Sequence, residues 1–305
     1  MIILLNQKGG LGNQLFQYTA GLYFAEKYGA RLEVIRDLAR NEVSCGWPVP
    51  FMLDKFCITT PVRKRTFLDR LLRTKSRLIG LVASPIRRIL GSYSHDPYFK
   101  NVGDFLPLLP LPVGTKRLYL HGHFQAYQYA QSVEKKLRSE LAFREPPSTA
   151  TAKILNRIRD CECPVSLHVR RGDYAVIQEG VWLLPMTYYD NAIAAILDIY
   201  PNATFFVFSD DIDYARANLP NRERMVFVNH NNEESSHEDL RLMSACHHHI
   251  IANSSFAWWG AWLNPNAEKV VIAPDGSWLP GINHPELIPP TWRRIPTQAL
   301  SIRSA

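Results

Sequence analysis

The chain has 305 residues, of which 46% are hydrophobic and 21% are charged, enough apolar material for two packed α/β domains of ordinary size. This composition excludes a disordered chain and a fibrous protein. The net charge of +7 favours an anionic partner, such as a nucleotide, a nucleic acid or an acidic membrane surface, without choosing among them.

The first residues of the chain show no targeting segment. Residues 2–5 form a short apolar stretch that lacks a basic region before it and is too short for a signal sequence or a membrane span. The five cysteines are dispersed and odd in number, which argues against a disulfide framework. We therefore expect a cytoplasmic protein, with a peripheral position on the inner membrane as the alternative.

The N-terminal part has the pattern of a βαβ unit. An apolar strand at 2–5 leads into a glycine-rich loop at 9–14, a helix at 15–28 and a second strand at 32–35. The glycine spacing is not that of a dinucleotide-binding turn, and no Gly-Lys-Ser/Thr follows, so the loop alone predicts only a turn.

Residues 61–90 are strongly basic, with nine Lys and Arg side chains interleaved with leucines and a single acid, Asp69. This pattern indicates a pair of basic amphipathic helices. Three interpretations remain open: a solvated helix face packed by its leucines, which we rank first, then a surface for an anionic membrane, and last a nucleic-acid site.

The Glu-Pro-Pro-Ser run at 145–148 indicates a domain boundary, which predicts domains at 1–147 and 148–305. Beyond it, helices and strands alternate regularly, which predicts a parallel, doubly wound sheet. The expected helices are 149–159, 186–200, 212–218, 238–245 and 255–263, and the expected strands are 165–169, 204–208, 225–228, 248–252 and 269–273. A further strand is expected at 117–120.

The strand at 165–169 ends directly in Arg170 and Arg171, followed by glycine and an acid. Arginine presents a fork of donors that matches phosphate oxygens, and ligands of open α/β sheets bind beyond the carboxyl ends of the strands. The alternative is a pair of surface arginines paired with carboxylates. Four strand exits of this domain carry polar groups and are expected to converge on one crevice: 168–173, 209–211, 229–230 and 253–256.

Three features near this crevice have plainer explanations. Ser255 and the Ser-Asp-Asp run at 209–211 are suited to capping helices as well as to holding a ligand. The histidines at 247–249 alternate in direction on a strand, so at most His247 and His249 could share a metal, and we expect none. The tryptophans at 258, 259 and 262 are expected in the core.

Five motifs occur together in this chain: GGLGNQLFQY at 9–18, GHFQ at 122–125, HVRRGDY at 168–174, FSDD at 208–211 and IANSSFAWWGAW at 251–262. With them the chain resembles, over nearly its whole length, the bacterial inverting α1,2-fucosyltransferases of glycosyltransferase family 11. The resemblance implies a GT-B-like α/β fold of two Rossmann-like domains. It also implies that the C-terminal domain, with its parallel sheet, binds GDP-β-L-fucose and that the N-terminal domain receives a galactoside acceptor.

The resemblance also implies roles for individual residues. Arg170 would stabilise the charge that develops on the departing diphosphate, with Arg171 assisting, and Asp239 would accept from the guanine N1 and N2 donors. The implied donor-binding residues are Asn13, Gln14, His168, Ser209, Asp210, Asp239, Asn253, Ser254, Ser255 and Phe256. The proposed general base is Asp173 or Glu179, although Asp173 could instead orient Arg170. Acceptor contacts are expected around Gln125, Tyr127 and Gln128.

Two fixed arginines can supply positive charge without a metal, so we expect no cofactor and no metal ion. The expected partners are GDP-fucose, a galactoside-containing oligosaccharide or lipid-linked glycan of surface polysaccharide or O-antigen synthesis, and an anionic membrane surface, with no nucleic acid. The first alternative is a GT-B transferase that uses another GDP-sugar or linkage. The second is a carbohydrate-binding module without turnover.

Overall fold

The computed structural model describes residues 1–36, 42–44, 47–73, 86–95, 104–176, 183–220, 222–275 and 286–297. The general-base candidate Glu179 and residues 74–85 of the basic segment lie outside this part of the chain. The chain divides into two compact units. The first runs from Met1 to Arg144 and includes Glu286 and Leu287, and the second takes up the chain from Glu145 onward apart from that short return segment.

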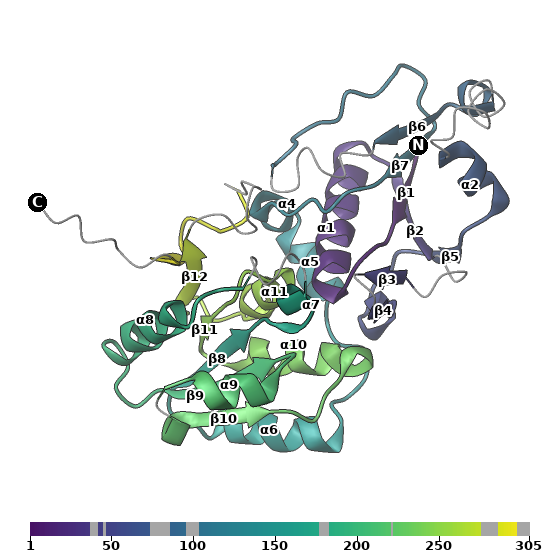
Figure 1. Cartoon of the computed structure of the whole chain (residues 1–305). Helices are drawn as coiled ribbons and strands as arrows, with labels where there is room; N and C mark the ends of the chain where they lie inside the picture. The colour runs from purple at the N-terminus through teal and green to yellow at the C-terminus, as the bar shows by residue number, and fades with distance from the viewer. Residues whose placement is uncertain are drawn as a thin grey trace, which may run out of the picture. The chain divides into compact units, whose positions relative to one another are not determined.

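The first unit is built on a parallel sheet of five strands in the order β5-β2-β1-β7-β6 (Figure 1). The strands of this sheet are β1 (Ile2–Asn6), β2 (Arg31–Arg36), β5 (Val62–Lys64), β6 (Ser92–His95) and β7 (Arg117–Leu120). The helices are α1 (Leu11–Lys27), α2 (Phe67–Arg73), α4 (Tyr127–Ser132) and α5 (Glu134–Glu140), and β3 (Glu42–Ser44) pairs antiparallel with β4 (Trp47–Val49).

Helix α1 begins four residues earlier than the sequence pattern predicts. Gly10 is its N-cap, in an extended conformation, and Gln14 N donates to the Gly10 carbonyl at 3.0 Å. Gly9, with φ of +80°, makes the turn out of β1 in the left-handed region that glycine tolerates best. Asn13 and Gln14 therefore lie in the first turn of α1 and not in a loop.

The second unit is built on a parallel sheet of six strands in the order β10-β9-β8-β11-β12-β13. Its strands are β8 (Pro164–Val169), β9 (Thr204–Ser209), β10 (Met225–Val228), β11 (His248–Ile250), β12 (Val271–Asp275) and β13 (Arg293–Pro296). Its helices are α6 (Thr149–Arg159), α7 (Gly172–Val176), α8 (Met186–Leu197), α9 (Ile212–Asn218), α10 (Ser236–Ala245) and α11 (Ser255–Leu263). The predicted doubly wound parallel sheet is confirmed, and β13 and α7 are additions to the prediction.

Helices cover both faces of this sheet. Val165, Leu167 and Val169 of β8 belong to one apolar cluster with buried residues of α8 and α9. The opposite face meets α11, since the His168 ring lies 5.9 Å from that of Phe256, and α11 packs on α10 (Figure 1). All six residues of β8 are buried, as expected for a central parallel strand.

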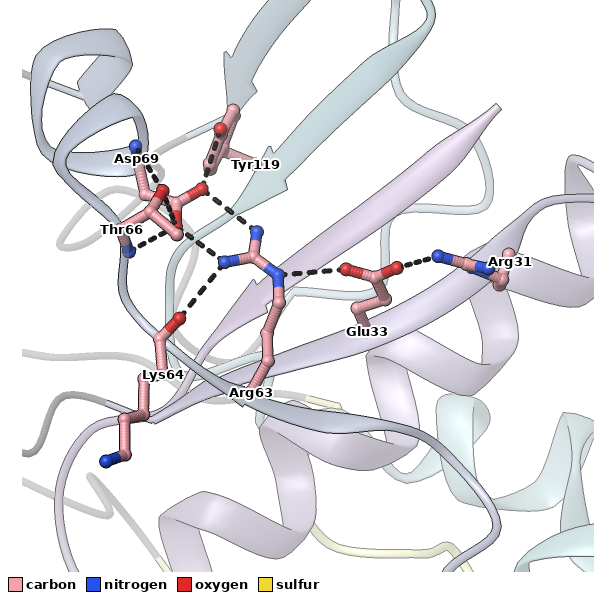
Figure 2. Close-up of polar contacts among 7 residues, drawn as sticks. All are labelled: Arg31, Glu33, Arg63, Lys64, Thr66, Asp69 and Tyr119. Carbon is pink, nitrogen blue, oxygen red and sulfur yellow. Dashed lines mark hydrogen bonds and ion pairs between the residues drawn. The ribbon is translucent and has the colours of Figure 1, made fainter.

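A buried ion network fastens the basic segment to the first sheet (Figure 2). Arg63 of β5 donates to Asp69 at 2.6 and 3.0 Å and to Glu33 of β2 at 2.9 Å. Asp69, which is 2% exposed, also accepts from Thr66 N at 2.8 Å and from the Tyr119 hydroxyl at 3.0 Å. Burial alone would raise the pKa of Asp69, but the hydrogen bonds from Arg63, Thr66 and Tyr119 outweigh it and hold that pKa well below its usual range.

Candidate active site

The candidate site of the second unit lies where the strand order reverses. Strands β9 and β10 extend the sheet on one side of β8, and β11, β12 and β13 extend it on the other. The chain leaves β8 at Arg170 and leaves β11 just before Asn253. Loops at such a reversal diverge above and below the sheet and leave a crevice at its carboxyl edge, where α/β proteins bind ligands. The polar residues that follow β8 and β11 are therefore positioned to bind a ligand.

Arg170 is held by the neighbouring strand. Val169 pairs with Ser209 in the parallel ladder, which places Arg170 beside Asp210. The Arg170 Nη1 lies 2.7 Å from Asp210 Oδ2, and the backbone N–H of Arg171 donates to Asp210 Oδ1 at 2.7 Å. One carboxylate thus bridges a guanidinium and a backbone amide, which fixes the direction of the Arg170 side chain. Arg170 is thus paired with a carboxylate, as the alternative interpretation expected.

Arg171 is fixed differently. Its Nε donates to Asp211 Oδ2 at 3.0 Å, and its guanidinium carbon lies 3.7 Å from the centre of the Tyr214 ring. Asp211 also caps α9, because its Oδ1 accepts from Tyr214 N at 3.1 Å. Ser209 Oγ in turn accepts from Asp211 N at 3.0 Å. The sequence predicted helix capping for the Ser-Asp-Asp run as a whole. In the structure Asp211 caps α9, and Asp210 pairs with Arg170.

Tyr174 of α7 joins the two strand exits. The Arg170 guanidinium carbon lies 5.3 Å from the centre of the Tyr174 ring, within range of a cation–π contact. The Tyr174 hydroxyl donates to the Asn253 carbonyl at 3.3 Å. Tyr174 and Tyr214 were not predicted as site residues, although both stand within four residues of an arginine or aspartate that was.

His168 lies in β8, two residues before Arg170, and is 4% exposed. Burial, and secondarily the charge of Arg170, lowers the pKa of His168 to about 3, so the imidazole is neutral at physiological pH. Its Nδ1 has no hydrogen-bond partner among the described residues. A buried polar atom of this kind is suited to meeting a ligand.

The start of α11 supplies further polar groups. Ser254, 6% exposed, is the N-cap, but its side chain makes no capping hydrogen bond, so capping is not the role of this hydroxyl. Ser255 is the first residue of the helix, and Asn253 is 4% exposed. The predicted group 253–256 thus lies together at the exit of β11, with Phe256 beside His168.

Asp239 lies in the first turn of α10 and accepts from Asn231 Nδ2 at 2.6 Å. Burial raises the pKa of Asp239 to about 6; the bond from Asn231 opposes this rise and the charge of Glu238 adds to it. A carboxylate with one defined partner and a perturbed pKa is a candidate for binding chemistry.

The predicted residues of the first unit form a second cluster. Gln125 Nε2 donates to Asn13 Oδ1 at 2.8 Å, which joins the exits of β7 and β1 where the order of that sheet reverses. The neighbouring Phe124 has φ of +51°, a strained conformation for a non-glycine residue, and its ring packs against Phe24 and Tyr129.

Other predicted residues of this unit are hydrogen-bonded to neighbouring groups of the same unit. Gln14 donates to the carbonyls of Gly9 and Pro50 and accepts from Met52 N, so its amide ties the glycine turn to a neighbouring segment. Tyr127 N donates to the Glu286 carbonyl at 2.9 Å, and Gln128 Nε2 donates to Glu286 Oε1 at 3.0 Å.

The remaining predictions divide between the core and the undescribed part of the chain. The side chain of Asp173 lies outside the described residues, although its backbone belongs to α7. His249 is fully buried between Ser166 Oγ and Asn264 Nδ2, both at 2.7 Å, which makes it a core residue. Trp258 and Trp259 are fully buried, as predicted.

The chain is similar to members of a known protein family. The family model described as "Glycosyl transferase family 11" matches residues 84–277. The O-antigen biosynthesis glycosyltransferase WbnK of Escherichia coli is 30% identical, over 93% of this chain and 97% of its own length. An alpha-1,2-colitosyltransferase of Escherichia coli is 31% identical over 90% and 91%, and the galactoside alpha-(1,2)-fucosyltransferase 2 of Mus musculus is 26% identical over 97% and 78%.

Among solved structures, the NodZ alpha-1,6-fucosyltransferase from Bradyrhizobium, co-crystallized with GDP, matches with a TM-score of 0.50 at 13% identity, over 85% of this chain and 91% of that one. Two Rossmann-like units with parallel sheets correspond to a GT-B-like fold. The chain belongs to glycosyltransferase family 11. No helix in the described part of the chain is both long and apolar enough to span a bilayer.

Proposed function

We propose that this enzyme transfers L-fucose from GDP-β-L-fucose to the 2-hydroxyl of a terminal galactoside, with inversion, during O-antigen or surface polysaccharide synthesis. The observation that carries the proposal is the pair of fixed guanidinium groups, Arg170 and Arg171, at the strand-order reversal of the second unit. The names of the relatives support the sugar class and the linkage: one acts in O-antigen synthesis, and another is a galactoside α1,2-fucosyltransferase.

The chemistry requires that charge on a leaving diphosphate be stabilised as the bond to C1 breaks. Guanidinium groups that are already oriented do this without reorganisation in the transition state. Asp210 and Asp211 hold Arg170 and Arg171 in place through bonds of 2.7 and 3.0 Å. We expect the reaction to need no metal ion, because the arginines provide the positive charge that a cation provides elsewhere.

The neighbouring groups are suited to the rest of the nucleotide. The neutral His168 offers one donor and one acceptor, and Ser254 offers a hydroxyl that is not spent on capping. Asp239 is assigned to the guanine edge. Asp173 or Glu179 is assigned as the base that takes the proton of the acceptor hydroxyl, since an inverting displacement needs one opposite the leaving group.

A second donor is favoured by one specific observation. A relative with 31% identity is named an alpha-1,2-colitosyltransferase, which supports a colitosyl donor as the second candidate. Parallel assays with GDP-fucose and GDP-colitose distinguish the two. A carbohydrate-binding module without turnover is the remaining alternative, and it has no use for a diphosphate clamp.

The test is GDP release from GDP-fucose with a panel of terminal galactosides, in EDTA, for the wild type and for Arg170→Ala. We expect galactoside-stimulated release in the wild type and loss of about 100-fold or more in kcat in the variant, with the fold intact. Arg216→Ala is the matched control, because Arg216 is an exposed arginine packed on the Phe227 ring outside the site. Near-normal turnover by Arg170→Ala would overturn the mechanism. The absence of both turnover and GDP binding in the wild type would overturn the proposal that the donor is GDP-fucose.

A further inference from the structure

The first turn of helix α2 exposes its apolar side chains. Among residues 67–71 the buried side chain is the acid Asp69, 2% exposed, which enters the ion network with Arg63 and Tyr119 (Figure 2). Phe67 is 80% exposed and Leu68 is 39% exposed. An amphipathic helix normally buries its apolar face. Here the charged Asp69 holds the helix to the sheet, while the apolar Phe67 and Leu68 are exposed.

A helical turn at residues 86–89 lies over the same face of the sheet. Ile86 and Leu90 pack against the cluster that contains Tyr119, and the Tyr119 hydroxyl also donates to Asp69 of α2. Ile89 of this turn is 78% exposed. Tyr119 therefore contacts both elements, which form a layer over this face of the sheet, and each element carries a strongly exposed apolar side chain, Phe67 or Ile89.

Exposed apolar side chains concentrate on these elements. Eight large hydrophobic residues in the described part of the chain are exposed, and three of them, Phe67, Leu68 and Ile89, belong to α2 and the turn at 86–89. Val62 is also exposed, but it precedes Arg63 on β5, whose side chain points toward α2, so Val62 belongs to the other face of the sheet. A cluster of this kind, in place of scattered single residues, indicates an interaction surface.

The charge around these residues has one sign. Arg70 and Arg88 are exposed, and the single acid in residues 61–90, Asp69, is buried against Arg63. The outer side of this layer therefore presents cations and apolar groups without an exposed acid from the segment.

We propose that α2 and the turn at 86–89 form a docking face for a bilayer rich in anionic phospholipids. The apolar tips of Phe67 and Ile89 enter the interface between headgroups and acyl chains, while Arg70 and Arg88 pair with headgroup phosphates. Lipid is favoured over nucleic acid, because two of the three exposed apolar side chains, Leu68 and Ile89, are aliphatic, and aliphatic side chains insert into a bilayer but have no ring to stack on bases. The proposal does not depend on the proposed sugar transfer.

Sedimentation with vesicles tests this docking face in the full-length protein. We use vesicles of phosphatidylglycerol with phosphatidylcholine, vesicles of phosphatidylcholine alone, and a single-stranded RNA as the competing polyanion. Arg70→Gln/Arg88→Gln removes two cations, which lowers the partition coefficient on anionic vesicles about 30-fold, at about 1 kcal/mol for each basic residue. Phe67→Asn/Ile89→Asn lowers it by about tenfold or more, because two inserted side chains are lost.

Matched controls separate docking from net charge and from folding. Lys135→Gln/Lys136→Gln removes two exposed cations of α5, and Leu108→Asn removes an exposed apolar residue near α1, whose Tyr23 and Tyr28 hydroxyls bond the carbonyls of Pro107 and Leu109. We expect these controls to bind vesicles like the wild type and all variants to unfold at the wild-type temperature. Equal binding by the docking-face and control variants overturns the proposal. So does loss of RNA binding in the docking-face variants with vesicle binding unchanged.

Discussion

Gly172 and Asp210 lie so close that a β-carbon on Gly172 would stand 2.5 Å from Asp210 Oδ2. The same oxygen lies 2.7 Å from Arg170 Nη1. The missing side chain of Gly172 therefore makes room for the carboxylate that orients Arg170. Gly172 has no positive φ, so its need for glycine comes from space and not from backbone conformation.

Replacing Gly172 by Ala should lower kcat about tenfold or more, because the new methyl group displaces the carboxylate and misorients the guanidinium. The fold should persist, since the backbone conformation suits alanine. Kinetics of the single variant and of Gly172→Ala/Asp210→Asn provide the check. The double variant should be no worse than the stronger single variant, and additive losses would show that Gly172 acts by another route.

Replacing Asp210 by Asn should lower kcat by about 10- to 100-fold while the affinity for GDP changes less. The amide keeps the shape but loses the charge that holds Arg170. Asp211→Asn is the comparison, because asparagine caps a helix as well as aspartate does and so leaves α9 intact while weakening the hold on Arg171. Steady-state kinetics and calorimetric GDP binding measure both. A loss confined to GDP affinity would assign Asp210 to binding alone.

Guanosine binding should weaken as the pH falls through about 6, where Asp239 takes up a proton. The proposed role needs the carboxylate, so below this pKa the apparent Kd should rise about tenfold for each pH unit. Guanosine is the probe because, unlike GDP, it has no phosphate that titrates in this range. Asp239→Asn should bind weakly and without this pH dependence. A wild-type Kd that stays constant between pH 7 and pH 5 would remove Asp239 from the base site.

The raised pKa of Asp239 also makes the free energy of unfolding depend on pH. The pKa of Asp239 is raised above its ordinary value of 3.8, so the folded protein binds this proton more tightly than the unfolded chain. The contribution of Asp239 to the free energy of unfolding is therefore fully present below pH 3.8 and is lost as the pH rises to about 6.

Replacing Asp69 by Asn should reduce the free energy of unfolding by roughly 3 kcal/mol, because it leaves the partly buried Arg63 with an incomplete set of partners. Glu134→Gln breaks an exposed i,i+4 pair with Arg138 and should cost at most about 0.5 kcal/mol. Chemical denaturation of both variants gives the comparison. Equal effects would mean that the network adds no more than a surface ion pair.

Much of the second unit could be predicted from sequence, because its elements repeat a regular rhythm. The helices α6, α9 and α11 and the strand β10 begin and end where the pattern predicts. Strand β13 was missed since Arg293 and Arg294 interrupt the apolar run by which a strand is recognised. The start of α1 was placed too late because glycines at its first positions resemble a loop.

The arginines of the site were predictable, while their partners were not. Arg170 and Arg171 follow an apolar strand, a pattern visible in one dimension. The assignment of Asp210 to Arg170 and of Asp211 to Arg171 depends on the register between β8 and β9, which sequence does not contain. The close approach of Gly172 to Asp210 is not visible in the sequence either, because Gly172 follows β8 and Asp210 follows β9.

The attachment of α2 through Asp69 has a consequence for how this protein can change over time. Since Asp69 reaches inward and ties the helix to the sheet, exposed positions such as Phe67 and Arg70 contribute little to the free energy of folding. These positions can exchange one surface character for another while the sheet beneath keeps its sequence. The residues that the first unit exposes on α2 are thus different from the residues of the ion network that stabilise its fold.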